Sequence, residues 1–322
     1  MKQANRVITK RNVYTEKSRF LDIDWLLFRY YVRLRLRSTI YKLLPKTFLY
    51  KRALRNHLKQ KGREIYRIDL KNPKTFAEKL LWLKAYHRFD NAHMLVDKYA
   101  AKSIIAEKLG KKYVIPVLAV YNWVSEMDFN QLPDKCVIKP NNGSGSVFIY
   151  DRSKGEEYEY YIRKRLGIIM KFDGYDLLWE WQYGAIEKKI IVEPYIDYLD
   201  DPSIISDYKF YCFNGIPKFV QLDQNRHGVH KRSFVDLNWK EMDLRFWKTP
   251  IKPIPDKPRN FSEMVDMATQ LSRDLVFARI DLYNIQGEIK FGEITLHPGS
   301  GHFPFQTYKD DLEIGAMLKL PV

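Results

Sequence analysis

One stretch near the C-terminus constrains the fold of this 322-residue chain more than any other. Residues 277–285 alternate apolar side chains with charged or aromatic ones, a Gln-Gly turn follows, and residues 288–296 form a returning strand. A Gly-rich loop, residues 297–301, then ends the second strand. The pattern predicts a β-hairpin with one apolar face and one polar face.

The polar face of this predicted hairpin gathers oxygen ligands. Asp281 lies on the first strand, and Glu293 and Thr295 lie on the second, all on one face. Two carboxylates and a hydroxyl are ligands that a hard cation such as Mg²⁺ prefers. Arg279 points the same way and can stabilise an anion held by such a metal. On this stretch alone, a solvated hairpin with a surface Arg–Asp pair is an equal alternative.

The net charge of the chain is concentrated at its N-terminus. The formal net charge is +16, and residues 1–63 hold 18 of the 55 Lys and Arg residues against three acidic ones. This distribution separates a basic segment from a nearly neutral body. Apolar residues recur at helical spacing among arginines and aromatics over residues 22–44, and a second basic helix is predicted over residues 47–60.

The basic segment has three candidate roles. A basic amphipathic helix with aromatics suits an anionic membrane surface, which makes residues 22–60 a candidate lipid-binding segment. A helix packed on the body, with a solvated basic rim, is the alternative. Nucleic acid is the least supported partner, because the sequence has no RNP motif, zinc finger or helix-turn-helix signature.

Cysteine usage and hydropathy bound the compartment. Cys136 and Cys212 have no zinc or redox spacing, which fits a reducing cytoplasm. The first residues lack the apolar core of a secretory signal, and no apolar run approaches the roughly 20 residues of a membrane span. We expect a cytoplasmic protein, peripheral on the inner face of the membrane if the basic segment binds lipid.

The first part of the body predicts helices followed by a strand. Thr75 and Glu78 have the spacing of a capping box, which marks a helix start. Another helix is predicted from Asp97 to Leu109, where a glycine ends it. The apolar, β-branched residues 114–121 predict a strand.

A Gly/Ser loop, residues 141–146, lies between two short predicted strands, residues 136–140 and 147–150. Such a loop can lay backbone N–H groups against phosphate oxygens, and Lys139 before it adds a positive charge. The loop lacks Walker A spacing, and no GxGxxG opens a helix here. A plain turn between two strands is the alternative and the commoner use of such a loop.

The middle of the chain predicts a strand end, a hairpin and a basic loop. Residues 189–196 form a strand that ends at a proline and can present backbone groups to a flat ring. Residues 207–222 form a hairpin on which Asp207 and Lys209 share a face. The basic loop, residues 223–233, either holds an anionic substrate or is solvated.

The order of these motifs is specific. From residue 72 onward they read NPKTFAEKLLWLK, LVDKYAAKSIIAEKLG, VIPVLAVY, CVIKPNNGSGSVFI, IIVEPYI, DYKFYCFNGIPKFVQ and FARIDLYNIQGEIKFGEITLHPGSG. Together they resemble the ATP-grasp fold, and more closely the TupA-like ATP-grasp family. The resemblance covers the chain from about Leu70 to the C-terminus and leaves out residues 1–63.

The resemblance implies an α+β class and an ATP-grasp fold, in which two α+β lobes sandwich a nucleotide, preceded here by the basic helical segment. We accordingly divide the chain into a basic helical N-terminal segment (1–63), an N-terminal lobe of the body (64–135), a central ATP-grasp lobe with the Gly/Ser loop (136–195) and a C-terminal ATP-grasp lobe with the metal site (196–322).

The resemblance also implies residues for binding ATP. Lys102 and Lys139 match two phosphate-binding lysines, and Asp207 resembles an acid on the ribose or phosphate side. The mobile loop that closes over the phosphates matches Gly143, Ser144, Gly145 and Ser146. The hinge that meets adenine matches Glu193, Pro194, Tyr195 and Ile196.

The remaining implied roles belong to the reaction. Asp281 and Glu293 match the Mg²⁺ carboxylates, and Arg279 matches the arginine near the transferring phosphate, with Lys209 as a second catalytic, phosphate-contacting residue. Thr295 stands where many ATP-grasp ligases carry Asn, and its hydroxyl can coordinate a metal or hold a ligand water. Substrate contacts are expected from Arg226, His227, Arg232 and Ser300.

The implied activity is ATP-dependent ligation of a carboxylate to an amine through an acylphosphate, with ATP and two Mg²⁺ ions. The expected partners are a carboxylated sugar or glycan and a small amine, which points to a uronic acid of a bacterial capsule or exopolysaccharide. A metal-dependent glycosyltransferase in polysaccharide biosynthesis is one alternative. A non-catalytic membrane or nucleic-acid adaptor with a degenerate nucleotide fold is the other.

Overall fold

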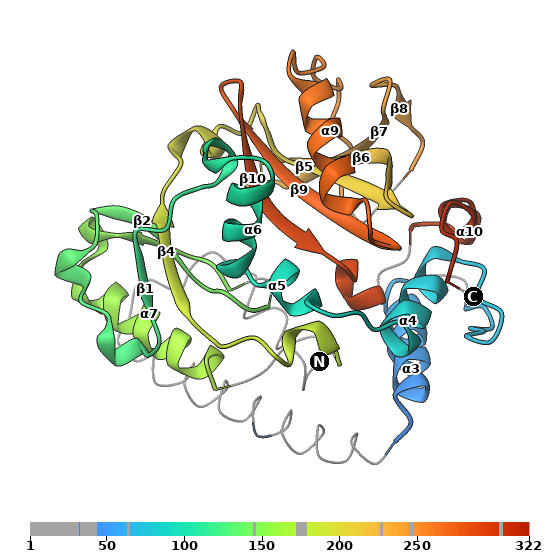
Figure 1. Cartoon of the computed structure of the whole chain (residues 1–322), viewed down its shortest axis with the longest axis horizontal. Helices are drawn as coiled ribbons and strands as arrows, with labels where there is room; N and C mark the ends of the chain where they lie inside the picture. The colour runs from blue at the N-terminus through green and yellow to red at the C-terminus, as the bar shows by residue number, and fades with distance from the viewer. Residues whose placement is uncertain are drawn as a thin grey trace. The chain divides into compact units, whose positions relative to one another are not determined.

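A computed structural model describes Val32 and residues 44–62, 65–143, 146–171, 179–225, 228–244, 248–302 and 305–321 (Figure 1). Contacts divide the chain into two compact units, Met1–Leu49 and Tyr50–Val322, and the second unit holds both sheets. The helix predicted over residues 22–44 lies almost entirely outside the described residues. The second predicted basic helix is confirmed as α3, Lys46–Gln60.

Three helices open the body. The predicted capping box starts α4, Phe76–Tyr86: Thr75 accepts the backbone N–H of Glu78, and the Glu78 carboxylate accepts the N–H of Thr75. Helices α5, Ala92–Val96, and α6, Ala100–Lys108, follow. The predicted start of α6 at Asp97 is wrong, because the Asp97 carboxylate accepts the N–H groups of the next turn and acts before the helix begins.

The smaller sheet has four antiparallel strands in the order β1-β4-β2-β3. They are β1, Ala119–Tyr121; β2, Lys135–Pro140; β3, Phe148–Asp151; and β4, Ile190–Pro194. The strand predicted over residues 114–121 keeps only its last three residues, because Pro116 has no N–H to give to a ladder. Helix α7, Gly155–Ile169, packs on this sheet through Tyr158, Ile162 and Leu166.

The larger sheet has six antiparallel strands in the order β10-β9-β5-β6-β7-β8. They are β5, Ile205–Phe213; β6, Ile216–Gln224; β7, Lys231–Asp236; β8, Glu241–Met242; β9, Phe277–Ile285; and β10, Glu288–Thr295. The two hairpins predicted from the sequence are β5–β6 and β9–β10, and both are confirmed. Pairing of β5 with β9 joins the hairpins into one sheet.

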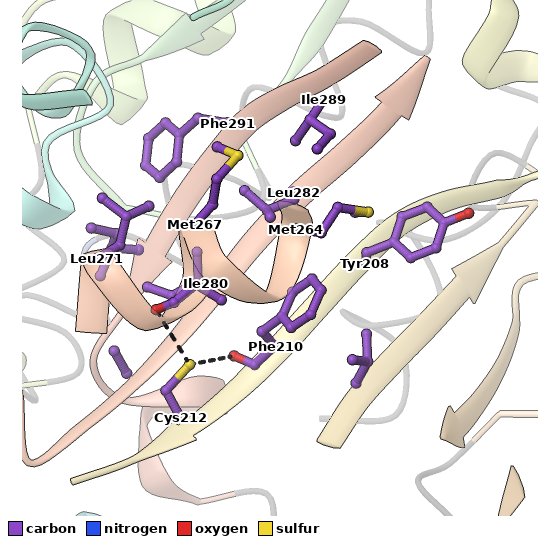
Figure 2. Packing of buried hydrophobic residues seen from close by; sticks show 14 of the residues in the cluster. Tyr208, Phe210, Cys212, Met264, Met267, Leu271, Ile280, Leu282, Ile289 and Phe291 are labelled. Atoms are coloured by element: carbon purple, nitrogen blue, oxygen red, sulfur yellow. Dashed lines mark hydrogen bonds between the residues drawn. The ribbon is translucent and has the colours of Figure 1, made fainter. Parts of the chain in front are cut away.

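One face of the larger sheet is apolar. Helix α9, Phe261–Ser272, lies across it, and Met264, Met267 and Leu271 pack against side chains of β5 and β9 such as Phe210 and Ile280 (Figure 2). Alternation along the strands therefore turns the neighbouring side chains to the opposite face. We call that opposite face the polar face, because it carries Lys209, Asp281 and Glu293.

Hydrogen bonds join helix α4 to the C-terminal helix α10, Tyr308–Ala316, and to the residues just after it. Lys79 of α4 donates to the carbonyls of Gly315 and Leu318, at 2.8 and 2.6 Å.

The described residues also form short 3₁₀ turns, which are η1, Lys111–Tyr113; η2, Val124–Glu126; η3, Phe129–Gln131; η4, Arg152–Lys154; η5, Trp181–Tyr183; η6, Asp197–Asp200; and η7, Pro298–Gly301. None of the helices in the described part of the chain has the length and hydropathy of a membrane-crossing segment.

Candidate active site

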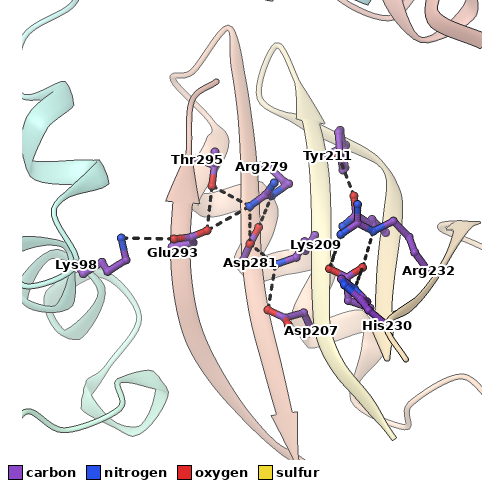
Figure 3. A network of polar contacts seen from close by, with 12 residues as sticks. Lys98, Asp207, Lys209, Tyr211, His230, Arg232, Arg279, Asp281, Glu293 and Thr295 are labelled. Carbon is purple, nitrogen blue, oxygen red and sulfur yellow. Dashed lines mark hydrogen bonds and ion pairs between the residues drawn. The ribbon is translucent and has the colours of Figure 1, made fainter. Parts of the chain in front are cut away.

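Strand register places the predicted catalytic residues in two adjacent rows across the polar face. Glu293 of β10 lies opposite Asp281 of β9, and Asp281 lies opposite Lys209 of β5. In the neighbouring row, Thr295 lies opposite Arg279. The convergence that side-chain alternation predicted is therefore present, with Lys209 added from the second hairpin (Figure 3).

Arg279 is the centre of this arrangement. Its Nε and Nη2 donate to the two oxygens of Asp281, at 2.7 and 2.8 Å. Nη2 also lies 3.2 Å from Glu293 Oε1 and 3.1 Å from Thr295 Oγ1. Burial alone would lower the pKa of Arg279, but the adjacent carboxylate of Asp281 raises it, so the guanidinium stays charged. The arrangement holds a permanent cation between two acids.

Lys209 supplies a second cation to the same row. Its Nζ lies 2.5 Å from Asp281 Oδ2 and 3.0 Å from Asp207 Oδ1. Burial raises the pKa of Asp281, and the charges of Arg279 and Lys209 oppose that shift. Asp207 and Lys209 thus share one buried network with the predicted metal carboxylates.

The two predicted phosphate lysines converge on the predicted hinge. Lys102 Nζ lies 2.8 Å from Glu193 Oε1, and Lys139 Nζ lies 2.6 Å from Glu193 Oε2. Lys102 also donates to the carbonyl of Ile115 at 2.6 Å. Burial would raise the pKa of Glu193, but the two ammonium groups lower it overall. A buried carboxylate therefore holds both lysines in place.

Lys98 is a candidate that sequence reasoning missed. Its Nζ lies 3.8 Å from Glu293 Oε2 and donates to the carbonyl of Gly143 in the Gly/Ser loop. Its backbone N–H donates to Asn141 at 3.0 Å. Burial lowers the pKa of Lys98, and the charge of Glu293 opposes this. The available signal was a second lysine four residues before Lys102, but only tertiary contact links it to β10.

The predicted substrate residues are spread over several places. Arg232 donates to both oxygens of Asp223, at 2.6 and 3.0 Å, and His230 Nε2 lies 3.1 Å from Asp223 Oδ1. Arg232 thus faces an internal acid. Ser300 accepts a hydrogen bond from Lys84 at 2.7 Å. Arg226 and His227 lie outside the described residues, as do Ser144 and Gly145 of the Gly/Ser loop.

The remaining predicted ATP residues lie along the smaller sheet. Gly143 has a left-handed φ of 77° just after β2, and Ser146 precedes β3. Pro194 ends β4, and Ile196 follows before η6. The Tyr195 ring lies 3.8 Å from Lys135 Nζ, so the hinge tyrosine carries a cation against its face.

The donor set fits Mg²⁺ by its chemistry. Within the described ranges, no three His, Cys, Asp or Glu side chains lie together as a complete metal site. Mg²⁺ needs fewer protein ligands, because water and phosphate oxygens fill most of its octahedral shell. The Glu293 side chain is 33% exposed and can accept a cation, whereas Asp281 is engaged by Arg279 and Lys209. Glu293 is the better ligand of the two.

Comparison with models of known protein families shows which family the chain belongs to. Residues 78–319 match the model of a family described as TupA-like ATPgrasp. The chain belongs to the TupA-like ATP-grasp family. ATP-grasp ligases in general use ATP and Mg²⁺. No curated protein matches the chain.

Solved structures show more distant similarity. D-Alanine–D-alanine ligase from Bacillus anthracis is 19% identical, with a TM-score of 0.40, and the match covers 64% of this TupA-like chain and 58% of that one. D-Alanine–D-alanine ligase from Helicobacter pylori is 17% identical, with a TM-score of 0.42, and the match covers 77% of this chain and 68% of that one. An L-amino acid ligase from Bacillus licheniformis is 15% identical, with a TM-score of 0.41, and the match covers 77% of this chain and 52% of that one. The chain thus spans little more than half the length of the Bacillus anthracis and Bacillus licheniformis enzymes.

Proposed function

We propose that this TupA-like protein is an ATP-dependent carboxylate–amine ligase that works through an acylphosphate. The observation that carries the proposal is Arg279, held between Asp281 and Glu293 on the polar face, with Lys98 joining Glu293 to the Gly/Ser loop. A fixed cation beside an exposed carboxylate is the arrangement that a transferring phosphoryl group and its metal require.

The nucleotide would be held by the lysines and the loop around them. Lys102 and Lys139 would contact phosphate oxygens, and Lys98 would add a third charge from its place between the loop and β10. The segment from Glu193 to Ile196 would meet the adenine. The loop of residues 143–146 would exclude water, because an acylphosphate in bulk water is hydrolysed.

ATP would supply the phosphoryl group when bound, and two Mg²⁺ ions would neutralise the charge that develops during its transfer. Glu293 would be the main ligand of the metal, and Asp281 would be the second carboxylate. The Thr295 hydroxyl would orient a ligand water. Arg279 would stabilise the charge that develops on the acylphosphate and on the tetrahedral intermediate. Lys209 would keep Asp281 ionised in its buried position.

The substrates we propose are a uronic acid of a bacterial surface polysaccharide or its precursor, and an amino acid or other amine. The family resemblance supports this pair, and the basic residues 1–63 support a lipid-linked glycan on the cytoplasmic face of a membrane. Arg232 supports the sugar less than its sequence position implied, because its guanidinium already binds Asp223.

The proposal is tested by ADP release from Mg-ATP with uronic acids crossed against amino acids and amino alcohols. We expect turnover that requires both a carboxylate and an amine. Glu293→Ala should lower kcat by about 100-fold or more, since a preorganised charge of this kind is worth 10²–10³. Glu288→Ala is the matched control, because Glu288 begins the same strand but is exposed.

Three results would contradict the proposal. Equal turnover in Glu293→Ala and Glu288→Ala would remove the metal site from the reaction. Sugar-nucleotide turnover without ATP would indicate a glycosyltransferase instead. Absence of ADP with every pair, including uronic acids carried on a nucleotide or a lipid, would leave a binding protein.

A further inference from the structure

A buried hydrogen bond joins the two segments that carry the predicted phosphate lysines. Asn141 follows β2, which carries Lys139, and Asp97 precedes α6, which carries Lys102. The amide nitrogen Nδ2 of Asn141 donates to Asp97 Oδ2 at 2.9 Å, and both residues are buried. We call these two residues the Asp97–Asn141 pair. The proposed chemistry gives the pair no direct part, so the reason for burying a carboxylate here lies in what the pair holds in place.

Asn141 is the first residue of the Gly/Ser loop, and its contacts fix the start of that loop. Its backbone N–H donates to the Lys189 carbonyl at 2.9 Å, and its side-chain Oδ1 accepts the Lys189 N–H at 2.8 Å. Nδ2 also donates to the carbonyl of Glu187 at 2.9 Å. An asparagine suits this position, because one side chain must both donate and accept. The loop is thereby attached to the residues just before β4 on one side and to Asp97 on the other.

Asp97 divides its two carboxylate oxygens between the helix and the loop. Oδ1 accepts the N–H groups of Tyr99 and Ala100, at 2.7 and 3.3 Å, at the start of α6, and Oδ2 accepts the hydrogen bond from Asn141. An asparagine at position 97 would keep the first set of contacts, because its oxygen caps a helix equally well. It would lose the second, because its amide nitrogen would face the amide nitrogen of Asn141. One substitution therefore separates the two roles of this carboxylate.

Lys98 transmits the position of the pair to the candidate active site. It follows Asp97 directly, and its backbone N–H donates to the Asn141 carbonyl at 3.0 Å. At the other end of the side chain, Nζ donates to the carbonyl of Gly143 and lies 3.8 Å from Glu293 Oε2 (Figure 3). A shift of the α6 start against the loop would move the root of this side chain and change both contacts.

We propose that the Asp97–Asn141 pair positions Lys98, Lys102 and Lys139 at the spacing that a nucleotide polyphosphate requires. The inference rests on the proposed function, in which these lysines hold ATP. A lysine acts on phosphate as a point charge whose attraction falls with distance, so the separation of the three ammonium groups decides how well they match a row of phosphates. Lys139 lies two residues before Asn141, and the pair ties its strand to the helix that carries Lys102. Asp97 and Asn141 are thus positioning residues that act through the lysines.

The first test measures nucleotide affinity directly in full-length Asp97→Asn. Titration calorimetry with Mg-ATP should give a dissociation constant about tenfold higher than that of the unmodified protein, which is the effect of losing one buried hydrogen bond. The sign separates two causes, because the Asp97 charge acts on Lys98 and its removal would by itself tighten phosphate binding. Adenosine, measured by competition with ATP, should change less than about twofold, because it has no phosphate for the lysines to attract.

Asp128→Asn is the matched control for this substitution. Asp128 caps η3 by accepting the Asn130 N–H at 3.0 Å, so the same change there keeps a cap and removes a charge outside the pair. The affinities for Mg-ATP and for adenosine should both equal those of the unmodified protein.

The exchanged pair, Asp97→Asn combined with Asn141→Asp, tests whether the hydrogen bond itself matters. It places a donor at position 97 opposite an acceptor at position 141, and its net charge equals that of the unmodified protein. Each single substitution should weaken Mg-ATP binding, whereas the combination should return the affinity to within about threefold of the unmodified value, since contacting residues are not additive.

The outcomes separate the pair from the ligase. Unchanged or tighter Mg-ATP binding in Asp97→Asn would overturn the positioning role, and equal losses of ATP and adenosine affinity would show that the pair only stabilises the fold. If Asp97→Asn does not fold, Mg-ATP binding about tenfold weaker in the exchanged pair would overturn the proposal. The expected affinities without ADP release from any carboxylate and amine would support the positioning role and overturn the ligase. Absence of Mg-ATP binding in the unmodified protein would overturn both.

Discussion

At the scale of single residues, Lys84 departs most from expectation. Helix α4 buries it completely, and its Nζ donates to the carbonyl and hydroxyl of Ser300, at 3.0 and 2.7 Å. Its pKa is about 8, because burial lowers it and the charge of Glu180 only partly restores it. A helical lysine in a sequence indicates a solvated side chain, and nothing in the pattern reveals that Glu180 and Ser300 enclose this one.

This buried lysine predicts a specific pH dependence of stability. The pKa of Lys84 is about 8 in the folded protein, against 10.5, the ordinary value for a lysine, in an unfolded chain. The unfolded chain therefore binds more protons between these values, so the contribution of Lys84 to the free energy of unfolding rises from pH 8 to pH 10.5. In urea titrations, Lys84→Met should lack this rise. The free energy of unfolding of the unmodified protein, minus that of Lys84→Met, should therefore increase from pH 8 to pH 10.5.

Three titratable groups interact electrostatically with Lys84. They are Glu180, His297 and His302. Lys71→Met, at an exposed position before α4, is the control. Parallel pH curves for Lys84→Met and the unmodified protein would mean that Lys84 titrates as an exposed lysine does.

At the scale of elements, the register of β10 depends on Gly292. The pairing with β9 shifts between Phe291 and Glu293, which brings Glu293 opposite Asp281. A Cβ at Gly292 would lie 2.9 Å from the Asp281 carbonyl oxygen and 3.1 Å from the Tyr283 ring. Only a glycine lets the two strands approach this closely, so the position of Glu293, the proposed metal ligand, depends on the residue before it.

We predict that Gly292→Ala disturbs stability and activity together. Forcing a methyl group into this contact should cost about 1–3 kcal/mol of unfolding free energy, and the displaced Glu293 should lower ADP release. Gly167→Ala is the control of opposite sign, because Gly167 lies in α7 with nothing near its Cβ position, and helical Ala is worth about 0.5–1 kcal/mol over Gly. Full activity and stability in Gly292→Ala would show that β10 tolerates another register.

Local patterns predicted the elements that carry the site, and tertiary contacts decided the rest. Alternation placed Glu293 and Thr295 on one face of β10. The register shift at Gly292 brings them to the face of Asp281, because without it Gly292 would lie opposite Asp281. The missed features needed distant partners. Lys98 matters through β10, and Arg232 turned inward because Asp223 of the paired strand accepts both of its hydrogen bonds.

At the scale of the whole molecule, α3 limits where the basic segment can be cut. Tyr50, Leu54 and Leu58 of this helix are buried with Ile68 and Leu70 of the body. Removing all of residues 1–63 would therefore expose a core surface and confuse unfolding with loss of a partner. A deletion that keeps α3 intact tests the basic residues alone.

We predict that deleting residues 1–43 weakens binding to vesicles of phosphatidylglycerol and phosphatidylcholine. Each basic residue near an anionic surface contributes about 1 kcal/mol, so sedimentation with such vesicles should fall steeply, while thermal unfolding of the body stays the same. Pure phosphatidylcholine vesicles are the control for charge. Undiminished sedimentation of the deleted protein would remove the membrane role from residues 1–43.

The pairing of Lys102 and Lys139 with Glu193 has a consequence for how a nucleotide enters. The two lysines carry their own internal counter-ion, so under the proposed function an arriving phosphate would have to displace a carboxylate. Entry of ATP would then exchange one anion for another at these cations, with fewer salt ions released than two solvent-exposed lysines would release. Phosphate would have to compete with Glu193 for both lysines.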